Sequence, residues 1–215
     1  MEKNNKPQQP VPQKKQAQPG RNVRSGYLYA LAAVIILAGL YYLLAELKVF
    51  SPKRRNLESV MAAYQLYNPA DTKMKVALFF GDPDSDGFRP ARAEIFASGQ
   101  PINQVKQALI LLCQGPAKDA GLDLLPEGTA LREAYLDPNS ILYVDMSQEF
   151  SANAKGGTTS EYQAVYSIIN TVFYNFNWVK GVRILINGEE KETVAGHIVI
   201  RGVMTPDTDL SGFKI

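Results

Sequence analysis

Three aspartates at alternate positions form the clearest chemical pattern in the sequence. Asp82, Asp84 and Asp86 precede Gly87, an order typical of the start of a calcium-binding loop, because alternate carboxylates on a tight turn can converge on a hard cation. The twelfth position of such a loop is normally glutamate, and here it is Ala93. The pattern therefore favours a solvated turn between two strands and leaves a calcium-dependent binding module as an alternative.

Four further carboxylates could serve glycosidic chemistry, which needs two acids about 5 to 10 Å apart. They are Glu133, Asp145, Glu149 and Glu161. Their spacing along the chain selects no pair. A cell-wall glycan hydrolase acting on peptidoglycan therefore stands as an alternative to a function without catalysis.

The chain has one histidine and one cysteine, and neither has the neighbours that catalysis requires. His197 has no nucleophile motif to serve, which favours a structural imidazole over a general base. Cys113 ends an apolar stretch, which favours a packed thiol, and a single cysteine excludes an intrachain disulfide. We therefore predict a protein that is not an enzyme and has no catalytic residues, metal ligands or cofactor.

The elements that must position these residues follow a pattern typical of an α+β domain. Apolar and alternating runs predict strands over residues 74–80, 92–97, 131–136, 141–146 and 182–186, with short closing strands over 192–194 and 197–200. Helical spacing predicts one helix over 102–112 and a longer one after Gly156 and Gly157, and Asn187-Gly188 predicts a tight turn. We expect a mixed sheet with two main helices on one face.

The longer helix carries more aromatic residues than one core-facing stripe can hold. At its start, Thr158 with Glu161 and Ser160 with Gln163 fit the capping pattern. Tyrosine and tryptophan are enriched in protein interfaces, where a rigid ring and a polar tip both contribute. The interface candidates are Tyr162, Tyr166, Tyr174 and Trp178.

An uncharged run of twenty residues, from Gly26 to Ala45, precedes this domain. As a helix it would reach roughly 30 Å, the hydrocarbon thickness of a bilayer. It is longer than the apolar region of a signal peptide, which is about 7 to 15 residues. We therefore predict a retained transmembrane helix over residues 26–47, with the lipid bilayer as a partner.

Charge divides the chain at the same place. Residues 1–55 hold ten Lys and Arg against two acids, a net charge of +8, whereas residues 56–215 hold thirteen against nineteen, a net charge of −6. A basic segment beside a span favours anionic lipid, and nothing in the pattern favours nucleic acid.

The predicted organisation has five parts. They are a disordered basic cytoplasmic tail (1–25), the transmembrane helix (26–47), a juxtamembrane linker or helix (48–72), the folded domain (73–202) and a C-terminal tail (203–215). This order predicts a single-pass protein of the bacterial inner membrane, with its C-terminal domain outside the cytoplasm.

Five segments occur in an order that resembles the GerMN domain, a family named from a sporulation and spore-germination protein. They are QALILLCQGP, LLPEGTALREAYLD, ILYVDMSQEF, GGTTSEYQAVYSIINTV and VKGVRILINGEEKETVAGHI, and the resemblance covers about residues 74–200. It implies attachment to the bacterial envelope and a βαββαβ-type fold akin to ring-forming domains of secretion-like assemblies, and it carries over no catalytic residue. We expect a non-enzymatic, membrane-anchored module that binds or scaffolds envelope proteins or copies of itself, in a sporulation-like, germination-like or cell-wall process.

Overall fold

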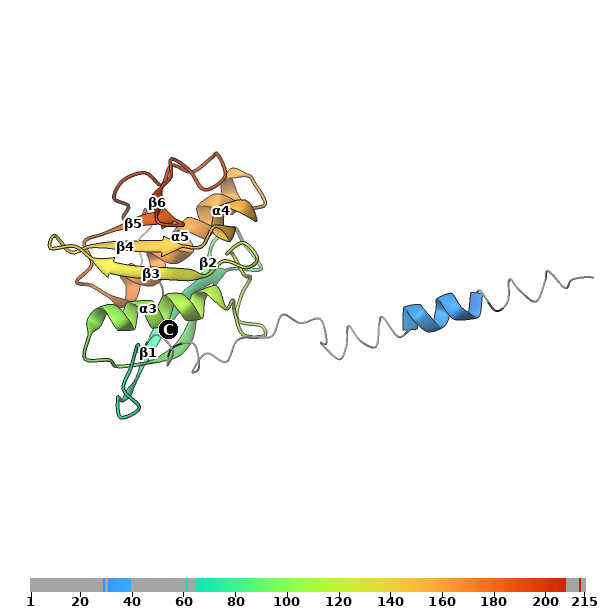
Figure 1. Ribbon diagram of the computed structural model, residues 1–215, viewed down its shortest axis with the longest axis horizontal. Coiled ribbons are helices and arrows are strands. Elements are labelled where there is room, and N and C mark those ends of the chain that lie inside the picture. Colours follow the sequence, from blue (N-terminus) through green and yellow to red (C-terminus); the bar gives the residue numbers. More distant parts are fainter. Residues whose placement is uncertain (1–28, 30, 40–60, 62–64, 208–212, 214–215) are drawn as a thin grey trace, which may run out of the picture. The chain divides into compact units, whose positions relative to one another are not determined.

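The computed structural model describes Tyr29, residues 31–39, Met61, residues 65–207 and Phe213 (Figure 1). The chain divides into two units, Met1–Lys53 and Arg54–Ile215. In the first unit, Tyr29 and residues 31–39 are helical. No helix within the described part of the chain has the length and hydropathy needed to cross a membrane. The predicted tail 1–25, much of the predicted span 26–47 and most of the segment 48–72 lie outside the described residues.

The strands of the second unit form two sheets. Strand β1 (Lys73–Gly81) pairs antiparallel with β2 (Phe88–Phe96) in a two-stranded sheet. A four-stranded sheet has the order β3-β4-β5-β6, with bounds Leu131–Leu136, Ile141–Met146, Gly181–Ile186 and Glu189–Glu190. Strands β4 and β5 run parallel, whereas the other neighbours are antiparallel. The five main predicted strands are confirmed, although they form two sheets and not one, and β2 begins earlier than predicted.

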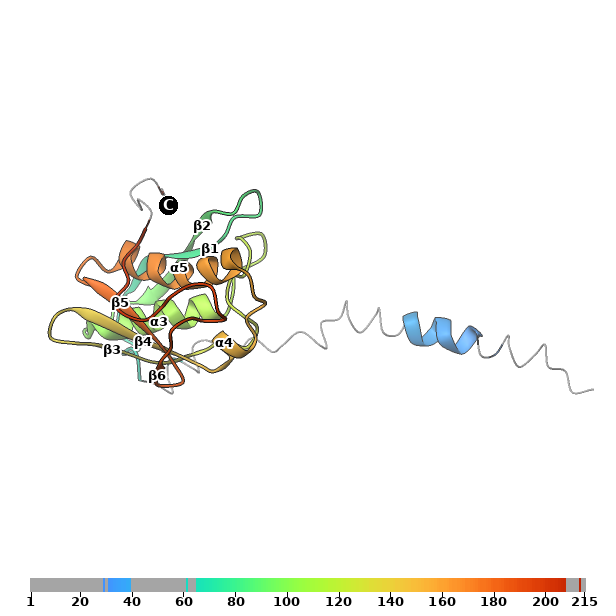
Figure 2. The same ribbon diagram turned by 90° about the horizontal axis from the view of Figure 1, so that it is seen from above.

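Two long helices cover one face of the four-stranded sheet, with the β1–β2 hairpin on the same side (Figure 2). They are α3 (Pro101–Cys113) and α5 (Thr158–Asn175), and a short helix α4 (Glu149–Ala152) precedes α5. Pro101 begins α3 favourably, because the first helical position needs no N–H donor. The order β2-α3-β3-β4-α5-β5 follows the predicted βαββαβ pattern, with β1, α4 and β6 added.

The apolar core lies between the helices and the sheet. Val144 of β4 and Ile184 of β5 belong to one buried cluster with Ile168 and Val172 of α5 and Leu109 of α3. Because β4 and β5 are the inner strands, their sequences are almost continuously apolar. The predicted apolar stripe of α5 therefore faces the sheet.

Side chains of α5 take the place of a strand along one edge of β1. The Ser167 hydroxyl donates to the Phe79 carbonyl (2.8 Å), and the Phe79 N–H donates to Thr171 Oγ1 (3.0 Å). The Asn175 amide accepts the Ala77 N–H (2.8 Å) and donates to the Ala77 carbonyl (2.7 Å). Four residues of helix rise about 6 Å and two residues of strand about 6.8 Å, so Thr171 and Asn175 reach Phe79 and Ala77 in turn.

Two local predictions are wrong. Residues 192–194 and 197–200 form no strands and meet at an isolated bridge between Thr193 and Val199. The N–H groups of His197 and Ile198 bond to Glu161, and the Val194 carbonyl accepts a bond from Ser151, so these groups are not available to a strand pair. Helix α5 begins at Thr158 after Gly157, whose φ is 105°, and no side chain caps it. The predicted capping by Thr158 and Ser160 is therefore absent. The tight turn is confirmed, with positive φ at Asn187 (56°) and Gly188 (82°).

The substitution Thr171→Val should lower the free energy of unfolding by about 2 kcal/mol, because it leaves the buried N–H of Phe79 without an acceptor at nearly unchanged side-chain volume. Urea unfolding of the full-length chain measures the change. The matched control is Thr159→Val, at an exposed position of the same helix, which should change stability by less than about 0.5 kcal/mol. Equal losses in the two variants would contradict the proposed bond.

Candidate functional site

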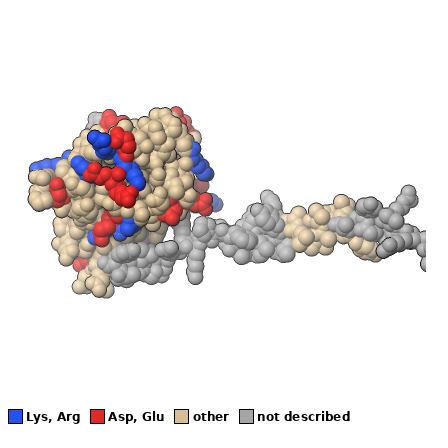
Figure 3. Space-filling view, turned by 45° about the horizontal axis from the view of Figure 1, so that its top comes forward, with Lys and Arg blue, Asp and Glu red and all other residues tan. Residues whose placement is uncertain are grey.

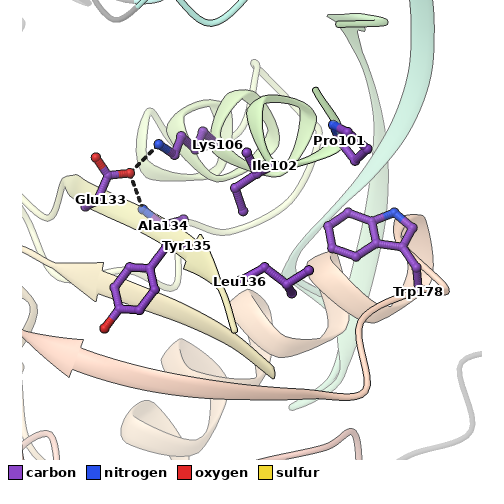
Figure 4. A pocket seen from close by; sticks show the side chains of 8 residues that line it. All are labelled: Pro101, Ile102, Lys106, Glu133, Ala134, Tyr135, Leu136 and Trp178. Carbon is purple, nitrogen blue, oxygen red and sulfur yellow. Dashed lines mark hydrogen bonds and ion pairs between the residues drawn. The ribbon is translucent and has the colours of Figure 1, made fainter. Parts of the chain in front are cut away.

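A groove of about 560 Å³ lies between α3 and β3. Its lining consists of Pro101, Ile102, Lys106, Glu133, Ala134, Tyr135, Leu136 and Trp178. In Figure 4, Ile102 points from α3 toward β3, Leu136 lies between Ile102 and Trp178, and Tyr135 points away from α3. Trp178 follows α5, so three separate elements of the chain meet at this groove.

The groove follows the open edge of β3. Four consecutive residues of the strand, 133–136, line it, and successive side chains of a strand point to opposite faces. A cavity on one face would meet only alternate residues, so this one lies along the edge. Strand β3 has β4 as its single neighbour among the described strands.

Strand register shows which backbone groups face the groove. The Asp137 N–H donates to the Ile141 carbonyl (3.0 Å), and the alternate residue Tyr135 stands opposite Tyr143. Because bonded residues alternate in an antiparallel pair, Ala134 and Leu136 direct their N–H and C=O groups away from β4. The Ala134 N–H accordingly donates to Glu133 Oε1 (2.8 Å), the carboxylate that also pairs with Lys106 (Figure 4).

Large apolar side chains remain exposed at this edge. Tyr135 is 45% exposed and Leu136 is 40% exposed. The Tyr135 ring stacks on Tyr143 of β4, with ring centroids 4.8 Å apart. Sequence analysis identified Trp178 and Glu133 but missed Ile102, Lys106 and Leu136. The sequence did predict a hairpin over residues 131–136 and 141–146, and no further strand was predicted to pair with its first strand. That missing neighbour was the available signal for an unpaired strand edge.

The other interface candidates contact the end of the chain. The Tyr162 hydroxyl donates to Asp207 (2.9 Å), and the Tyr174 hydroxyl donates to the Phe213 carbonyl (3.2 Å). Burial and the neighbouring Asp207 carboxylate raise the pKa of Tyr162 to about 12. Tyr166 packs on Tyr162, with centroids 4.5 Å apart. The structure therefore separates these three tyrosines from Trp178, which alone lies at the groove.

The four candidate catalytic carboxylates all have structural partners. Glu133 pairs with Lys106, as described above. Asp145 accepts the Gly188 N–H (2.7 Å) and lies 3.4 Å from Arg132, so it fixes the turn after β5. Glu149 is bonded to Ser147, and Glu161 binds the segment around His197.

The lowered pKa values of Glu133, Glu149 and Glu161 do not suit the general acid of glycosidic chemistry, which must stay protonated. Burial raises the pKa of Glu133, but bonds from Lys106 and Ala134 outweigh it, so the pKa is lowered. A bond from Ser147 lowers the pKa of Glu149. Burial does raise the pKa of Asp123, but that residue lies outside the groove.

A basic residue lies among the aspartates of the β1–β2 turn. The guanidinium of Arg89 is 2.8 Å from Asp82 Oδ1 and 3.1 Å from Asp84 Oδ2. Asp82 also accepts a bond from Ser85 (2.9 Å). Within the described part of the chain, no group of three or more His, Cys, Asp or Glu could hold a metal ion. Because the Arg89 guanidinium lies against two of the three carboxylates, the turn resembles a solvated hairpin connection more than a calcium loop.

Glu161 is a buried carboxylate that holds the segment after β6. It is 2% exposed, accepts the N–H groups of His197 (3.1 Å) and Ile198 (3.0 Å), and lies 2.6 Å from the His197 Nδ1. Burial raises the pKa of Glu161, but these bonds outweigh it and the pKa is lowered. His197 thus has a structural partner. Burial raises the pKa of the Cys113 thiol to about 12, which opposes thiolate chemistry.

Acidic and basic side chains are mixed on the face that Figure 3 shows. Around β5 and β6, Arg183 pairs with Glu190, Lys191 with Glu189, and Arg201 with Glu192. Such pairs neutralise each other and do not make the continuous positive surface that nucleic-acid binding requires.

Comparison with known families gives a match over most of the folded domain. A model of the family described as "Germane: Sporulation and spore germination" matches residues 77–192, more than half of the chain. The matched region runs from β1 to just beyond β6 and includes α3, β3 and Trp178. No curated protein matches the chain.

Several solved structures are similar in fold. The tandem GerMN domains of the sporulation protein GerM from Bacillus subtilis are 19% identical, with a TM-score of 0.49, and the match covers 65% of this chain and 52% of that one. The first of those domains is 20% identical, with a TM-score of 0.48, over 63% of this chain and 99% of that one. A candidate lipoprotein from Clostridium perfringens is 23% identical, with a TM-score of 0.44, over 64% of this chain and 92% of that one.

Glu161→Gln should lower the free energy of unfolding at pH 7 by about 2 kcal/mol, because it weakens charge-assisted bonds to a buried carboxylate. In the wild-type chain this contribution is present above the ordinary glutamate pKa of 4.5 and is lost as the pH falls through the lowered pKa of the folded state. The Glu161→Gln variant should not show this part of the decrease in stability below pH 4.5. Urea unfolding at pH 7 and at steps below pH 4.5 measures both effects.

The control is Glu127→Gln, which removes the same charge from an exposed position. Its stability at pH 7 should stay within about 0.5 kcal/mol of wild type. If Glu161→Gln and the wild-type chain lost stability in parallel below pH 4.5, the assigned role of Glu161 would be rejected.

Proposed function

The chain belongs to the GerMN family of sporulation and spore-germination domains, and on that basis we propose that it is a non-enzymatic module that binds and scaffolds proteins of the cell envelope. The process is a sporulation-like, germination-like or cell-wall-associated one. The observation that carries the proposal is the apolar groove along the open edge of β3. Exposed apolar side chains at an unpaired strand edge are typical of binding surfaces.

The chemistry of the groove supports binding over catalysis. Its charged residues, Lys106 and Glu133, pair with each other, and the pKa of Glu133 is lowered. The rest of the lining is largely apolar, and Ile102, Leu136 and Trp178 face its interior (Figure 4). Such a lining favours side chains of a protein over the polar surface of a glycan. We therefore name an envelope protein or a second copy as the partner, ahead of peptidoglycan.

The proposed module is anchored by the helix predicted over residues 26–47. In the described part of that helix, Leu31, Val34, Ile35, Ile36 and Leu37 are all more than 60% exposed. A helix with apolar side chains exposed on every side suits a lipid environment better than water. The proposed location is the inner membrane, with the folded domain outside the cytoplasm.

Alkaline carbonate extraction tests the anchor. The full-length chain should stay with the membrane pellet, because about twenty apolar residues in lipid resist extraction that removes proteins held by charge. A chain that lacks residues 26–47 should move to the supernatant. Release of the intact full-length chain would reject the anchor without bearing on the groove.

Photocrosslinking in cells tests the groove. A photoreactive amino acid in place of Leu136, which is 40% exposed at β3, should crosslink to a defined partner. The control places the same group at Leu122, which is 51% exposed and outside the groove. Adding Trp178→Ala to the Leu136 probe should reduce the crosslink at least fivefold, because truncating an aromatic anchor that the partner covers costs about 1 kcal/mol or more.

Three results would count against a binding role for the groove. They are identical products from the two positions, no product from Leu136, and a yield that Trp178→Ala leaves unchanged. Partner bands from Leu136 that are absent from Leu122 would support it.

A further inference from the structure

The open edge of β3 has a defined bonding pattern. Ala134 and Leu136 direct their N–H and C=O groups toward the groove, while Tyr135 and Asp137 bond to β4. Backbone groups two residues apart on an edge match the spacing of a second extended chain. We propose that an extended, basic segment of a partner protein adds to β3 as a further strand. This inference rests on the proposed function and specifies the form and charge of the ligand.

An oxygen atom already lies where a carbonyl of the added strand would bind. Glu133 Oε1 accepts the Ala134 N–H (2.8 Å), although Glu133 is the preceding residue and its side chain is 53% exposed. Ala134 itself is 1% exposed, so an added strand reaches its N–H only after the Glu133–Lys106 pair has moved aside. The Glu133 carboxylate is half exposed and keeps its hydration when it moves, so a strand carbonyl can replace it without leaving a buried charge unpaired. The added strand gains bonds at both Ala134 and Leu136, whereas Glu133 satisfies only one N–H. In the absence of a partner, Glu133 protects the edge from non-specific pairing.

The groove beside the edge supplies a site for an apolar side chain. Ile102 of α3, Leu136 of β3 and Trp178 converge on the same space (Figure 4). Alternate side chains of an added strand point toward this space, and the others point to solvent. The ligand is therefore an alternating segment with at least one aliphatic or aromatic residue on its inner face.

Charge determines which alternating segment fits. Glu133 and Asp137 stand at the two ends of the edge residues 134–136, and the pKa of each is lowered, so both are ionised at neutral pH. Lys106 pairs with Glu133, and Arg183 lies near Asp137 but also pairs with Glu190, so these acids outnumber their basic partners by three to two. The net charge of residues 56–215 is −6, so the surroundings also attract cations. Lysine or arginine at the outward positions of the ligand is complementary to this edge.

Two synthetic peptides with blocked ends test the proposal on the full-length chain in detergent. One is SKVKIKVS, which alternates lysine with apolar residues, and the other is SEVEIEVS, which keeps the apolar residues and reverses the charge. Trp178 is the only tryptophan of the chain, so its fluorescence reports directly on the groove. The lysine peptide should change this fluorescence saturably, with a dissociation constant at least tenfold lower than that of the glutamate peptide.

The variant Ala134→Pro tests the backbone bond. Proline has no N–H and is tolerated at strand edges whose N–H points away from the sheet, as that of Ala134 does. With its thermal unfolding unchanged, this variant should bind SKVKIKVS at least tenfold more weakly. If the variant fails to fold, amide hydrogen exchange of the wild-type chain decides. The lysine peptide should then slow exchange in residues 131–137 at least tenfold.

Several outcomes would overturn strand addition. They are no fluorescence change at millimolar peptide, equal affinity for the two peptides, unchanged affinity in a folded Ala134→Pro chain, and protection of α5 with none in β3. Dimerisation that protects β3 without peptide would make a second copy the occupant and would also reject the basic ligand. A crosslink from Leu136 in cells alongside any of these results would retain the binding function while rejecting strand addition. If neither the crosslink from Leu136 nor peptide binding is observed, both the binding function and strand addition are rejected.

Discussion

The bonds between α5 and the edge of β1 are the interaction on which the rest of the domain depends. An isolated two-stranded hairpin is at best marginally stable in water, and here the inner edge of β1 is also buried. Ser167, Thr171 and Asn175 satisfy that edge with side-chain donors and acceptors at the spacing a strand would provide. The hairpin and α5 thereby become one unit. Helix α3 then packs against that hairpin and β3, and this packing creates the groove.

The edges of β1 and β3 are covered by different kinds of side chain. At β1, the buried side chains of Ser167 and Thr171 and the partly buried side chain of Asn175 bond to the backbone, and any incoming strand would have to break these hydrogen bonds. At β3, a single half-exposed carboxylate covers one N–H and is held by one lysine. Protection that depends on one flexible side chain is reversible. Because the cover of β3 is weaker than that of β1, the proposed binding site is at β3.

Sequence patterns predicted the local elements better than their assembly. The hairpin 131–136 and 141–146 is confirmed residue for residue because its alternation and its turn are both encoded locally. The division into two sheets was missed, because Ser167, Thr171 and Asn175 look like ordinary polar helix positions until β1 is placed beside them. Glu161 was interpreted as a capping residue, but its real partners are 36 and 37 residues away. The groove joins α3, β3 and Trp178, and no local pattern marks such a meeting.

The size of the groove bears on how a scaffold built from it would work. Stable protein complexes commonly bury about 1,600 Å², far more than one strand edge and one apolar groove provide. A single contact of this kind should therefore be weak and short-lived. Tethering raises the fraction of such a weak complex that forms, because two proteins held at the same membrane meet at effective concentrations that reach the millimolar range. If the chain is anchored as proposed, a short edge covered by Glu133 would suffice to recruit a neighbour at the membrane, whereas in free solution the same carboxylate would keep the edge covered.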